Sequence, residues 1–181
     1  MTTDKVLLRA KLRHVRDRFA AAPHPPIAIA DAFRARLSHG LTVASYVPIG
    51  SEADPSPLAR IAMEAGCALV LPHVTTRAAP IRFLAWETEA ELALGPFGLR
   101  QPAESAAELR PDIILTPLVG FDRSLNRLGQ GAGHYDRAFA AFPEAWRVGV
   151  AWSVQELPRL PLDPWDLPLH AIATEQEWLT S

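Results

Sequence analysis

The chain has 181 residues, of which 49% are apolar and 21% are charged, and its formal net charge at pH 7 is -2. These values fit one globular domain with a core large enough to fold unaided, and they exclude a disordered chain, a coiled coil and a general nucleic-acid surface. No stretch reaches the roughly 20 apolar residues of a membrane span, and the opening residues lack a secretory signal. We therefore expect a soluble cytoplasmic protein that contacts neither membrane nor nucleic acid.

The first predicted element is a helix over residues 4–21, with Thr3 as its N-cap. Its apolar stripe recurs at spacings of four, three and four and comprises Leu8, Leu12, Val15 and Phe19. Basic side chains run along the border of that stripe at nearly the same spacing, namely Lys5, Arg9, Arg13 and Arg16. Helical geometry therefore predicts one buried face whose charged edge can reach a neighbouring cleft.

A second helix is predicted over residues 26–38, and short apolar runs then alternate with helical stretches. We expect strands at 41–48, 67–72, 80–86, 112–121, 147–152 and 170–174, and helices at 57–65 and 135–142. Continuous apolar runs are typical of strands covered on both faces. The single cysteine, Cys67, is expected to be a buried strand residue. The pattern predicts a single three-layer α/β sandwich over residues 1–181 with a largely parallel sheet.

Ligands of such sheets bind beyond the carboxyl ends of the strands, which directs attention to the loop after residue 121. Gly129, Gly131 and Gly133 alternate there, directly before a predicted helix. Such glycines let backbone N–H groups approach an anion at the helix N-terminus, although they also suit any tight strand-to-helix connection. Arg127 enters the loop and Asp136 leaves it, which adds a phosphate-binding cation and a candidate Mg²⁺ ligand.

Residues 127–137 read RLGQGAGHYDR, which resembles the glycine loop of the 5-formyltetrahydrofolate cyclo-ligase family. Further similar segments are KVLLR at 5–9, YVPIGSEAD at 46–54, FGLRQP at 97–102 and the stretch 150–175. The resemblance implies a fold like that of sugar-phosphate isomerases and CoA transferases. It also implies a ligase of folate one-carbon metabolism that converts 5-formyltetrahydrofolate to 5,10-methenyltetrahydrofolate with MgATP, releasing ADP and phosphate. Phosphoryl transfer to the formyl oxygen would rely on positioning and charge rather than on a protein nucleophile.

The resemblance also implies roles for individual residues. The expected ATP-binding residues are Lys5, Arg9, Arg127, Leu128, Gly129, Gln130, Gly131, Ala132, Gly133, His134 and Tyr135. The expected folate-binding residues are Val47, Glu52, Gln130, Gly131 and His134. Glu52 would accept hydrogen bonds from the pterin N–H groups. Arg127 and His134 are the expected catalytic residues, and Asp136 and Asp166 are expected to hold Mg²⁺.

Four residues depart from the usual family pattern. Gln130 and His134 replace tyrosines, Ala132 replaces a glycine, and Gln101 replaces a glutamate. We hypothesise that a protonated His134 adds a cation facing phosphate; the alternative is a neutral, packed ring without pH dependence. The remaining basic residues of the first helix, Arg13, Arg16 and Arg18, are expected to lie on a solvated edge.

Two other functions remain open at this point. A phosphosugar isomerase on a related sheet would need a base for carbon-proton abstraction and no ATP. A non-catalytic folate or nucleotide sensor would bind its ligands without turnover. Consumption of ATP would distinguish the cyclo-ligase from the isomerase. Release of phosphate in a single turnover would distinguish it from the sensor. The expected partners are a reduced folate and ATP, bound to a monomer.

Overall fold

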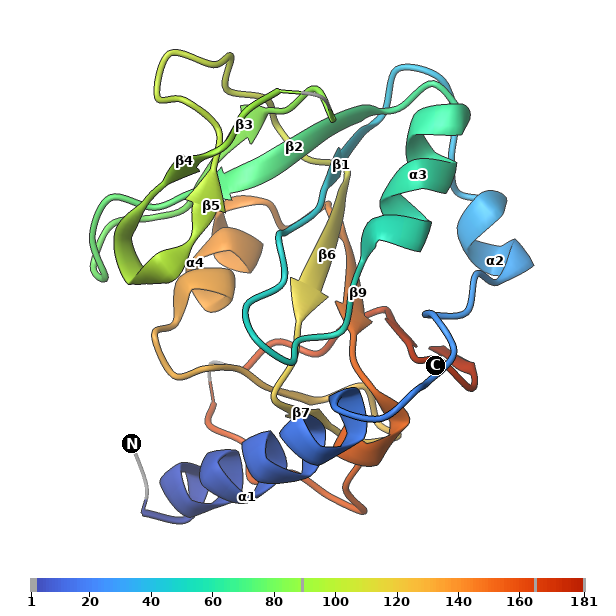
Figure 1. The fold of residues 1–181 in the computed structure, drawn as a ribbon, viewed down its shortest axis with the longest axis vertical. Coiled ribbons are helices and arrows are strands. Elements are labelled where there is room, and N and C mark those ends of the chain that lie inside the picture. Colours follow the sequence, from blue (N-terminus) through green and yellow to red (C-terminus); the bar gives the residue numbers. More distant parts are fainter. Residues whose placement is uncertain (1–2, 89, 165, 181) are drawn as a thin grey trace.

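The computed structural model describes residues 3–88, 90–164 and 166–180, and a seven-stranded sheet runs through its centre (Figure 1). In sheet order the strands are β11 (Trp178–Thr180), β10 (Ala171–Ala173), β9 (Trp146–Val150), β6 (Ile113–Pro117), β1 (Thr42–Ala44), β2 (Ala68–His73) and β3 (Arg82–Ala85). The inner five pair in parallel, and the edge strands β3 and β11 pair antiparallel. The prediction of a largely parallel sheet is therefore confirmed.

Helices cover both faces of this sheet. On one face, α2 (Asp31–Arg34) and α3 (Ser56–Glu64) bury Phe33 and Leu58 against a cluster that includes Val43 of β1. On the other face, α4 (His134–Ala141) buries Phe139 in a cluster with Ile114 of β6. Successive residues of a strand point to opposite faces of the sheet. Neighbouring apolar residues of one strand therefore pack alternately into the clusters on the two faces.

The long helix α1 (Thr3–Ala20) lies across the end of the sheet toward which β6 and β9 point (Figure 1). Its Leu12 packs into a small third cluster with Val119, Leu128 and Leu160. The helix is thereby fixed beneath the carboxyl ends of the strands, where the sequence predicts chemistry. None of the helices in the described ranges is long and apolar enough to cross a membrane.

The predicted helix over 26–38 is wrong for most of its length, because only Asp31–Arg34 is helical. The segment before α2 runs without helical hydrogen bonds, and the Ala28 N–H donates to the Thr174 carbonyl at the end of β10. Ile27 is buried in the core there. Burial of an extended segment against the sheet has therefore overridden local helix propensity.

The predicted strand over 112–121 is two strands. β6 ends at Pro117, and β7 (Gly120–Phe121) pairs antiparallel with β8 (Arg127–Leu128) in a separate hairpin. Proline has no N–H to donate, which favours the end of a strand at that point. A second small hairpin, β4 (Ala93–Leu94) and β5 (Arg100–Gln101), was not predicted and encloses the short 3₁₀ helix η1 (Pro96–Gly98). Another 3₁₀ helix, η2 (Ser153–Gln155), follows β9. Cys67 is buried as expected but lies just before β2 rather than within it.

Candidate functional site

The glycine loop connects the β7–β8 hairpin to α4 and thus hangs at the carboxyl end of the sheet. Gly131 and Gly133 have φ angles of 97° and 70°, in the left-handed region that favours glycine. Gly133 directly precedes the first helical residue, His134. Two of the three alternating glycines therefore meet a conformational need of the backbone, which turns the chain sharply into α4.

Arg127 and Asp136 lie at the two ends of this loop and form an ion pair across it. The Arg127 guanidinium also lies over the ring of Phe139, 4.9 Å from its centroid. Only 6% of the Arg127 side chain is exposed, and its Nε has no hydrogen-bond partner among the residues that the structure describes. The loop therefore holds a buried cation that is only partly satisfied and whose orientation is fixed by α4.

A cavity of about 350 Å³ lies beside the loop and collects many of the predicted residues. Those on its wall are Val47, Glu52, Arg127, Gly129, Gln130, Ala132, His134 and Tyr135. The remaining wall includes Phe97 of η1 and the strand-end residues Pro72 and Val74. A mostly apolar wall with a few polar groups is typical of a site for a small organic ligand.

Lys5 and Arg9 reach the region from α1, although neither is on the cavity wall. The Lys5 Nζ is 2.7 Å from Oδ2 of both Asp163 and Asp166. The Arg9 Nε donates to the Gly129 carbonyl over 2.7 Å. Both side chains are buried, and of the two it is Arg9 that contacts the glycine loop.

The contact between Lys5 and the two carboxylates changes the pKa values of Lys5 and Asp166. Burial by itself lowers the pKa of Lys5, but hydrogen bonds from its ammonium group to Asp163 and Asp166 outweigh burial and raise the pKa. Burial likewise favours a higher pKa for Asp166. There, the Asp163 backbone N–H and Lys5 outweigh burial and lower the pKa. Asp163 was not predicted as a site residue, although it lies three residues before Asp166 in a proline-rich turn.

Glu52 lies in the loop between β1 and α3, whose path is fixed by local contacts. Gly50, at a φ of 59°, allows a tight turn in which the Glu52 N–H donates to the Ile49 carbonyl. The Tyr46 hydroxyl donates to the Ala53 carbonyl over 2.5 Å and closes the loop. Glu52 Oε2 accepts from the Ile49 N–H over 3.0 Å. Its carboxylate is thereby held at the cavity wall, with only 7% of its side chain exposed.

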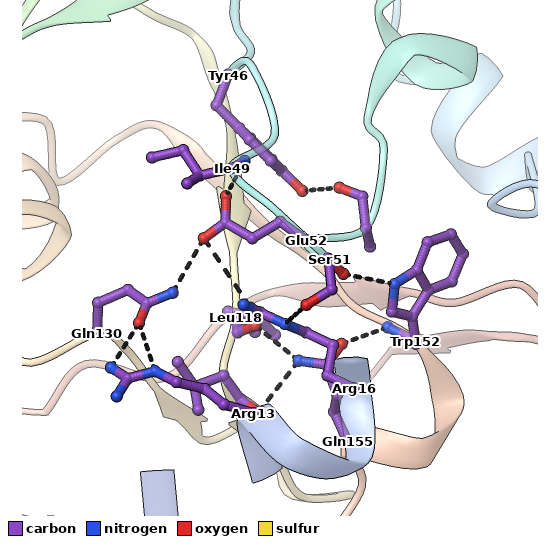
Figure 2. A network of polar contacts seen from close by, with 12 residues as sticks. Arg13, Arg16, Tyr46, Ile49, Ser51, Glu52, Leu118, Gln130, Trp152 and Gln155 are labelled. Atoms are coloured by element: carbon purple, nitrogen blue, oxygen red, sulfur yellow. Dashed lines mark hydrogen bonds and ion pairs between the residues drawn. The ribbon is translucent and has the colours of Figure 1, made fainter. Parts of the chain in front are cut away.

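Arg16 corrects the expectation of a solvated helix edge, whereas Arg13 is half-buried and makes exposed contacts to another element. The Arg13 guanidinium donates to Gln130 Oε1 over 2.7 and 3.2 Å, and Arg16 donates to the Ser51 hydroxyl over 2.9 Å (Figure 2). Arg16 is buried, with Nη1 4.0 Å from Glu52 Oε1. Their spacing from Lys5 and Arg9 is the signal that could have placed them at the site. Arg18 is exposed, as expected.

His134 lies on the cavity wall, but its surroundings favour a neutral ring. Its Nδ1 is 3.1 Å from Nη2 of Arg137, a group that can only donate, so Nδ1 acts as the acceptor. Burial, together with the charges of Arg137 and Arg77, lowers the pKa of the imidazole. These contacts speak against the hypothesis of a protonated His134 and favour the neutral alternative.

Asp136 and Asp166 do not form a pre-built metal cage. Within residues 3–88, 90–164 and 166–180, no three His, Cys, Asp or Glu side chains are grouped as a metal site. Each aspartate is instead paired with a cation, Asp136 with Arg127 and Asp166 with Lys5. Mg²⁺ in phosphate sites commonly takes one or two carboxylates and completes its shell with water and phosphate oxygens. The carboxylates present fit that mode of binding.

Gln101, where the resembled family usually has glutamate, is buried and is not on the cavity wall. Its Oε1 accepts from the Val74 N–H over 3.1 Å, which ties β5 to the cavity wall. The side chain also lies against Gly95, where an added Cβ would be 2.4 Å from the Gln101 amide carbon. This residue therefore fixes the β4–β5 hairpin beside the cavity.

Comparisons with known proteins point to one family. The model of the 5-formyltetrahydrofolate cyclo-ligase family matches residues 1–175. The 5-formyltetrahydrofolate cyclo-ligase of Escherichia coli K12 is 32% identical over 147 residues, covering 76% of this chain and 81% of that protein. The cyclo-ligase of Mycolicibacterium smegmatis is 34% identical over 166 residues, 84% of each chain. The NMR structure of 5,10-methenyltetrahydrofolate synthetase from Aquifex aeolicus superposes with a TM-score of 0.71 at 30% identity, covering 97% of this chain and 92% of that one.

Proposed function

The chain belongs to the 5-formyltetrahydrofolate cyclo-ligase family, and from this premise we propose how its residues convert 5-formyltetrahydrofolate to 5,10-methenyltetrahydrofolate with MgATP. The observation that carries the proposal is one cavity with a buried Arg127 at the glycine loop and a buried Glu52 carboxylate on its wall. A cation beside a glycine-rich loop at a helix N-terminus suits a triphosphate. A carboxylate on an apolar wall suits a flat ring with N–H donors.

The ATP side of the site is formed by the glycine loop and α1. The loop N–H groups and the N-terminal end of α4 favour a phosphate group. Within the part of the chain that the structure describes, the Arg127 Nε has no hydrogen-bond partner, and Arg9 already contacts the loop at Gly129, so both cations lie within the same region. Lys5 joins them from the preceding turn of α1.

The folate side is formed by the loop after β1 and by the cavity wall. Glu52 keeps lone pairs available for the N–H groups of the pterin, and Val47 and Tyr135 offer apolar surface to its ring. Burial raises the pKa of the Tyr135 hydroxyl well above its ordinary value, so this group stays protonated and can donate a hydrogen bond.

The reaction needs the formyl oxygen to become a leaving group. In the proposed sequence this oxygen attacks the γ-phosphorus and ADP departs; N10 then attacks the activated carbon, and loss of the N10 proton and of phosphate gives the methenyl bridge. Arg127 neutralises charge on the transferring phosphoryl group. Because Nδ1 of His134 accepts from Arg137, its Nε2 carries the proton and can donate to a developing anionic oxygen.

Asp136 and Asp166 would hold Mg²⁺ together with phosphate oxygens of ATP. The bound ion would neutralise phosphate charge during transfer. For Asp136, release from Arg127 would free both partners at once, the carboxylate for the ion and the guanidinium for phosphate.

The test is a direct assay of the purified protein with 5-formyltetrahydrofolate and MgATP. We expect the near-ultraviolet absorbance of the methenyl product to rise only when both substrates are present. A single-turnover measurement should release one phosphate for each product formed. Binding of both ligands without phosphate release would instead identify the sensor, and product formation without ATP would overturn the proposed use of ATP.

A further inference from the structure

The side-chain amide of Gln130 lies between a guanidinium and a carboxylate (Figure 2). Its Oε1 accepts from Nη2 and Nε of Arg13 over 2.7 and 3.2 Å. Its Nε2 donates to Oε1 of Glu52 over 3.0 Å. These contacts join α1, the glycine loop and the loop after β1 through one side chain.

The two neighbours of Gln130 define which way its amide faces. The Arg13 guanidinium can only donate, so it requires the amide oxygen. The ionised Glu52 carboxylate can only accept, so it requires the amide NH₂. A rotation of the amide by half a turn would place NH₂ against the guanidinium and oxygen against the carboxylate, breaking both contacts. Arg13 therefore selects the Gln130 orientation that serves Glu52.

Three groups of the protein contact the Glu52 carboxylate and restrict its orientation. The Ile49 N–H contacts Oε2, whereas the Gln130 NH₂ contacts Oε1 and Arg16 lies 4.0 Å from the same oxygen. A carboxylate on a flexible side chain must be ordered before it can accept two parallel hydrogen bonds from a ring. Ordering in advance removes that cost from ligand binding.

We propose that Arg13 is a positioning residue for the folate subsite, acting on Glu52 through the oriented amide of Gln130. The inference rests on the proposed function, because it assumes that Glu52 meets the pterin. It assigns a role to a basic residue of α1 that is not on the cavity wall. It also assigns to Gln130 a specific requirement, namely one acceptor toward α1 and one donor toward Glu52, which neither Met nor Glu supplies.

The first experiment compares Arg13→Met with Arg18→Met, which removes the same charge from an exposed position of the same helix. Dissociation of 5-formyltetrahydrofolate is measured by equilibrium dialysis without ATP, and KM for both substrates by absorbance. We expect Arg13→Met to raise the folate Kd and KM by about threefold to tenfold, the range for one ordinary hydrogen bond, because the contact between Arg13 and Gln130 is exposed. KM for ATP and the melting temperature should match those of Arg18→Met. Equal changes in the two KM values would overturn the proposal.

The second experiment tests whether Arg13 acts through Gln130. In the double variant Arg13→Met/Gln130→Met, the loss of folate affinity should be no larger than in Gln130→Met alone, because the two residues share one chain of contacts. Additive losses would contradict this. Gln130→Glu keeps the acceptor for Arg13 but loses the donor for Glu52, so its folate affinity should fall at least as far as that of Gln130→Met. Retained affinity in Gln130→Glu would overturn the orientation argument.

The outcomes separate this inference from the proposed function. If the parent protein forms no methenyl product, the proposed function fails, whatever the variants do. If the parent is active and Arg13→Met binds folate as the parent does, only the positioning role fails. Arg13→Lys provides a rescue test: it restores a donor at one point, so its folate Kd should lie between those of the parent and Arg13→Met.

Discussion

Arg127 Nη2 contacts Oδ1 of Asp136 across nine residues of sequence, so the glycine loop is closed by a pair of opposite charges. The arginine is nearly buried, whereas 34% of the Asp136 side chain is exposed. A phosphate bound to Arg127 would take the place of the Asp136 carboxylate. A metal ion bound to Asp136 would take the place of the Arg127 guanidinium. Without either ligand, Arg127 and Asp136 neutralise each other's charge, although the Arg127 Nε has no hydrogen-bond partner among the described residues.

The first prediction concerns Asp136→Asn, which keeps the shape of the side chain and removes its charge. We expect the Mg²⁺ concentration for half-maximal activity to rise by about tenfold or more, with little change in folate affinity. A Mg²⁺ titration of the rate and equilibrium dialysis of the folate measure the two effects. Glu144→Gln, at an exposed acid just beyond α4, is the control. Equal losses in both measurements would indicate a structural role for Asp136.

A second prediction follows from the two carboxylates that Lys5 holds. Because the folded-state pKa of Asp166 is lowered, its contribution to stability is complete above its unfolded pKa and is lost as pH falls through the folded pKa. In Lys5→Met, the melting temperature should therefore be lower than in the parent near pH 7, and the difference should shrink below about pH 4. KM for ATP should rise.

The matched control for that variant is Lys11→Met, on the exposed side of α1. The melting temperatures of the parent and both variants are compared between about pH 3 and pH 8. This range starts about one unit below the ordinary carboxyl pKa and ends above neutrality. A gap that stays constant across this range would show that Lys5 stabilises the fold through packing alone.

Glu52→Gln is expected to weaken the folate side selectively. The substitution keeps volume but replaces a charge-assisted acceptor, so KM for 5-formyltetrahydrofolate should rise by about tenfold or more while KM for ATP stays near the parent value. Glu64→Gln, at an exposed position of α3, serves as the control. A change confined to KM for ATP would mean that the two subsites are assigned the wrong way round.

The pH dependence of the rate tests the charge state of His134. Burial and two nearby arginines lower its pKa, so the neutral ring should predominate at and above the ordinary histidine pKa. We therefore expect the pH–rate profiles of the parent and His134→Tyr to have the same shape between about pH 6 and pH 8. A decline of the parent rate through neutrality that is absent from His134→Tyr would restore the hypothesis of a protonated ring.

Two core phenylalanines give a last, paired prediction. Phe33 and Phe139 are both fully buried, and each substitution to alanine should cost about 3–5 kcal/mol of unfolding free energy. Phe139 also lies under the Arg127 guanidinium, whereas Phe33 packs beside Trp146 on the other face of the sheet. Denaturant titrations and KM for ATP should show similar destabilisation but a raised KM only for Phe139→Ala. A raised KM for ATP in both variants would indicate that a general loss of packing, rather than the contact with Arg127, causes the effect.

Six of the seven strands of the central sheet were predicted, because their apolar runs are continuous and short, whereas the edge strand β11 was missed. β6 and β9, for instance, lie inside the predicted ranges 112–121 and 147–152, except that β9 begins one residue earlier, at Trp146. The predicted helix at 26–38 failed because contacts far along the chain decide it: Ala28 pairs with Thr174. Sequence periodicity reports only local order, so it does not reveal such a competing partner.

Site residues that belong to a sequence motif were predicted, whereas residues that reach the site only through the folded geometry were missed. The glycine loop was expected from its residues and Glu52 from the family resemblance, and residues of both line one cavity. Arg13 and Arg16 share the spacing of Lys5 and Arg9, yet a basic side chain on a helix border is usually solvated. Their contacts depend on Gln130 and Ser51, which come from two distant loops. Only the folded arrangement identifies these partners.

The ion pairs of Lys5 span 158 and 161 residues of sequence, which sets an order of assembly. During synthesis, α1 emerges first, and its buried ammonium group must wait for the segment that carries Asp163 and Asp166. The sheet strands β1, β2 and β6 can pair before then, because they precede that segment. A ribosome-bound chain stopped before residue 163 would therefore hold much of its sheet while Lys5 lacks both carboxylates. Contacts this remote in sequence form slowly and late, so binding competence should appear as a final event of biosynthesis.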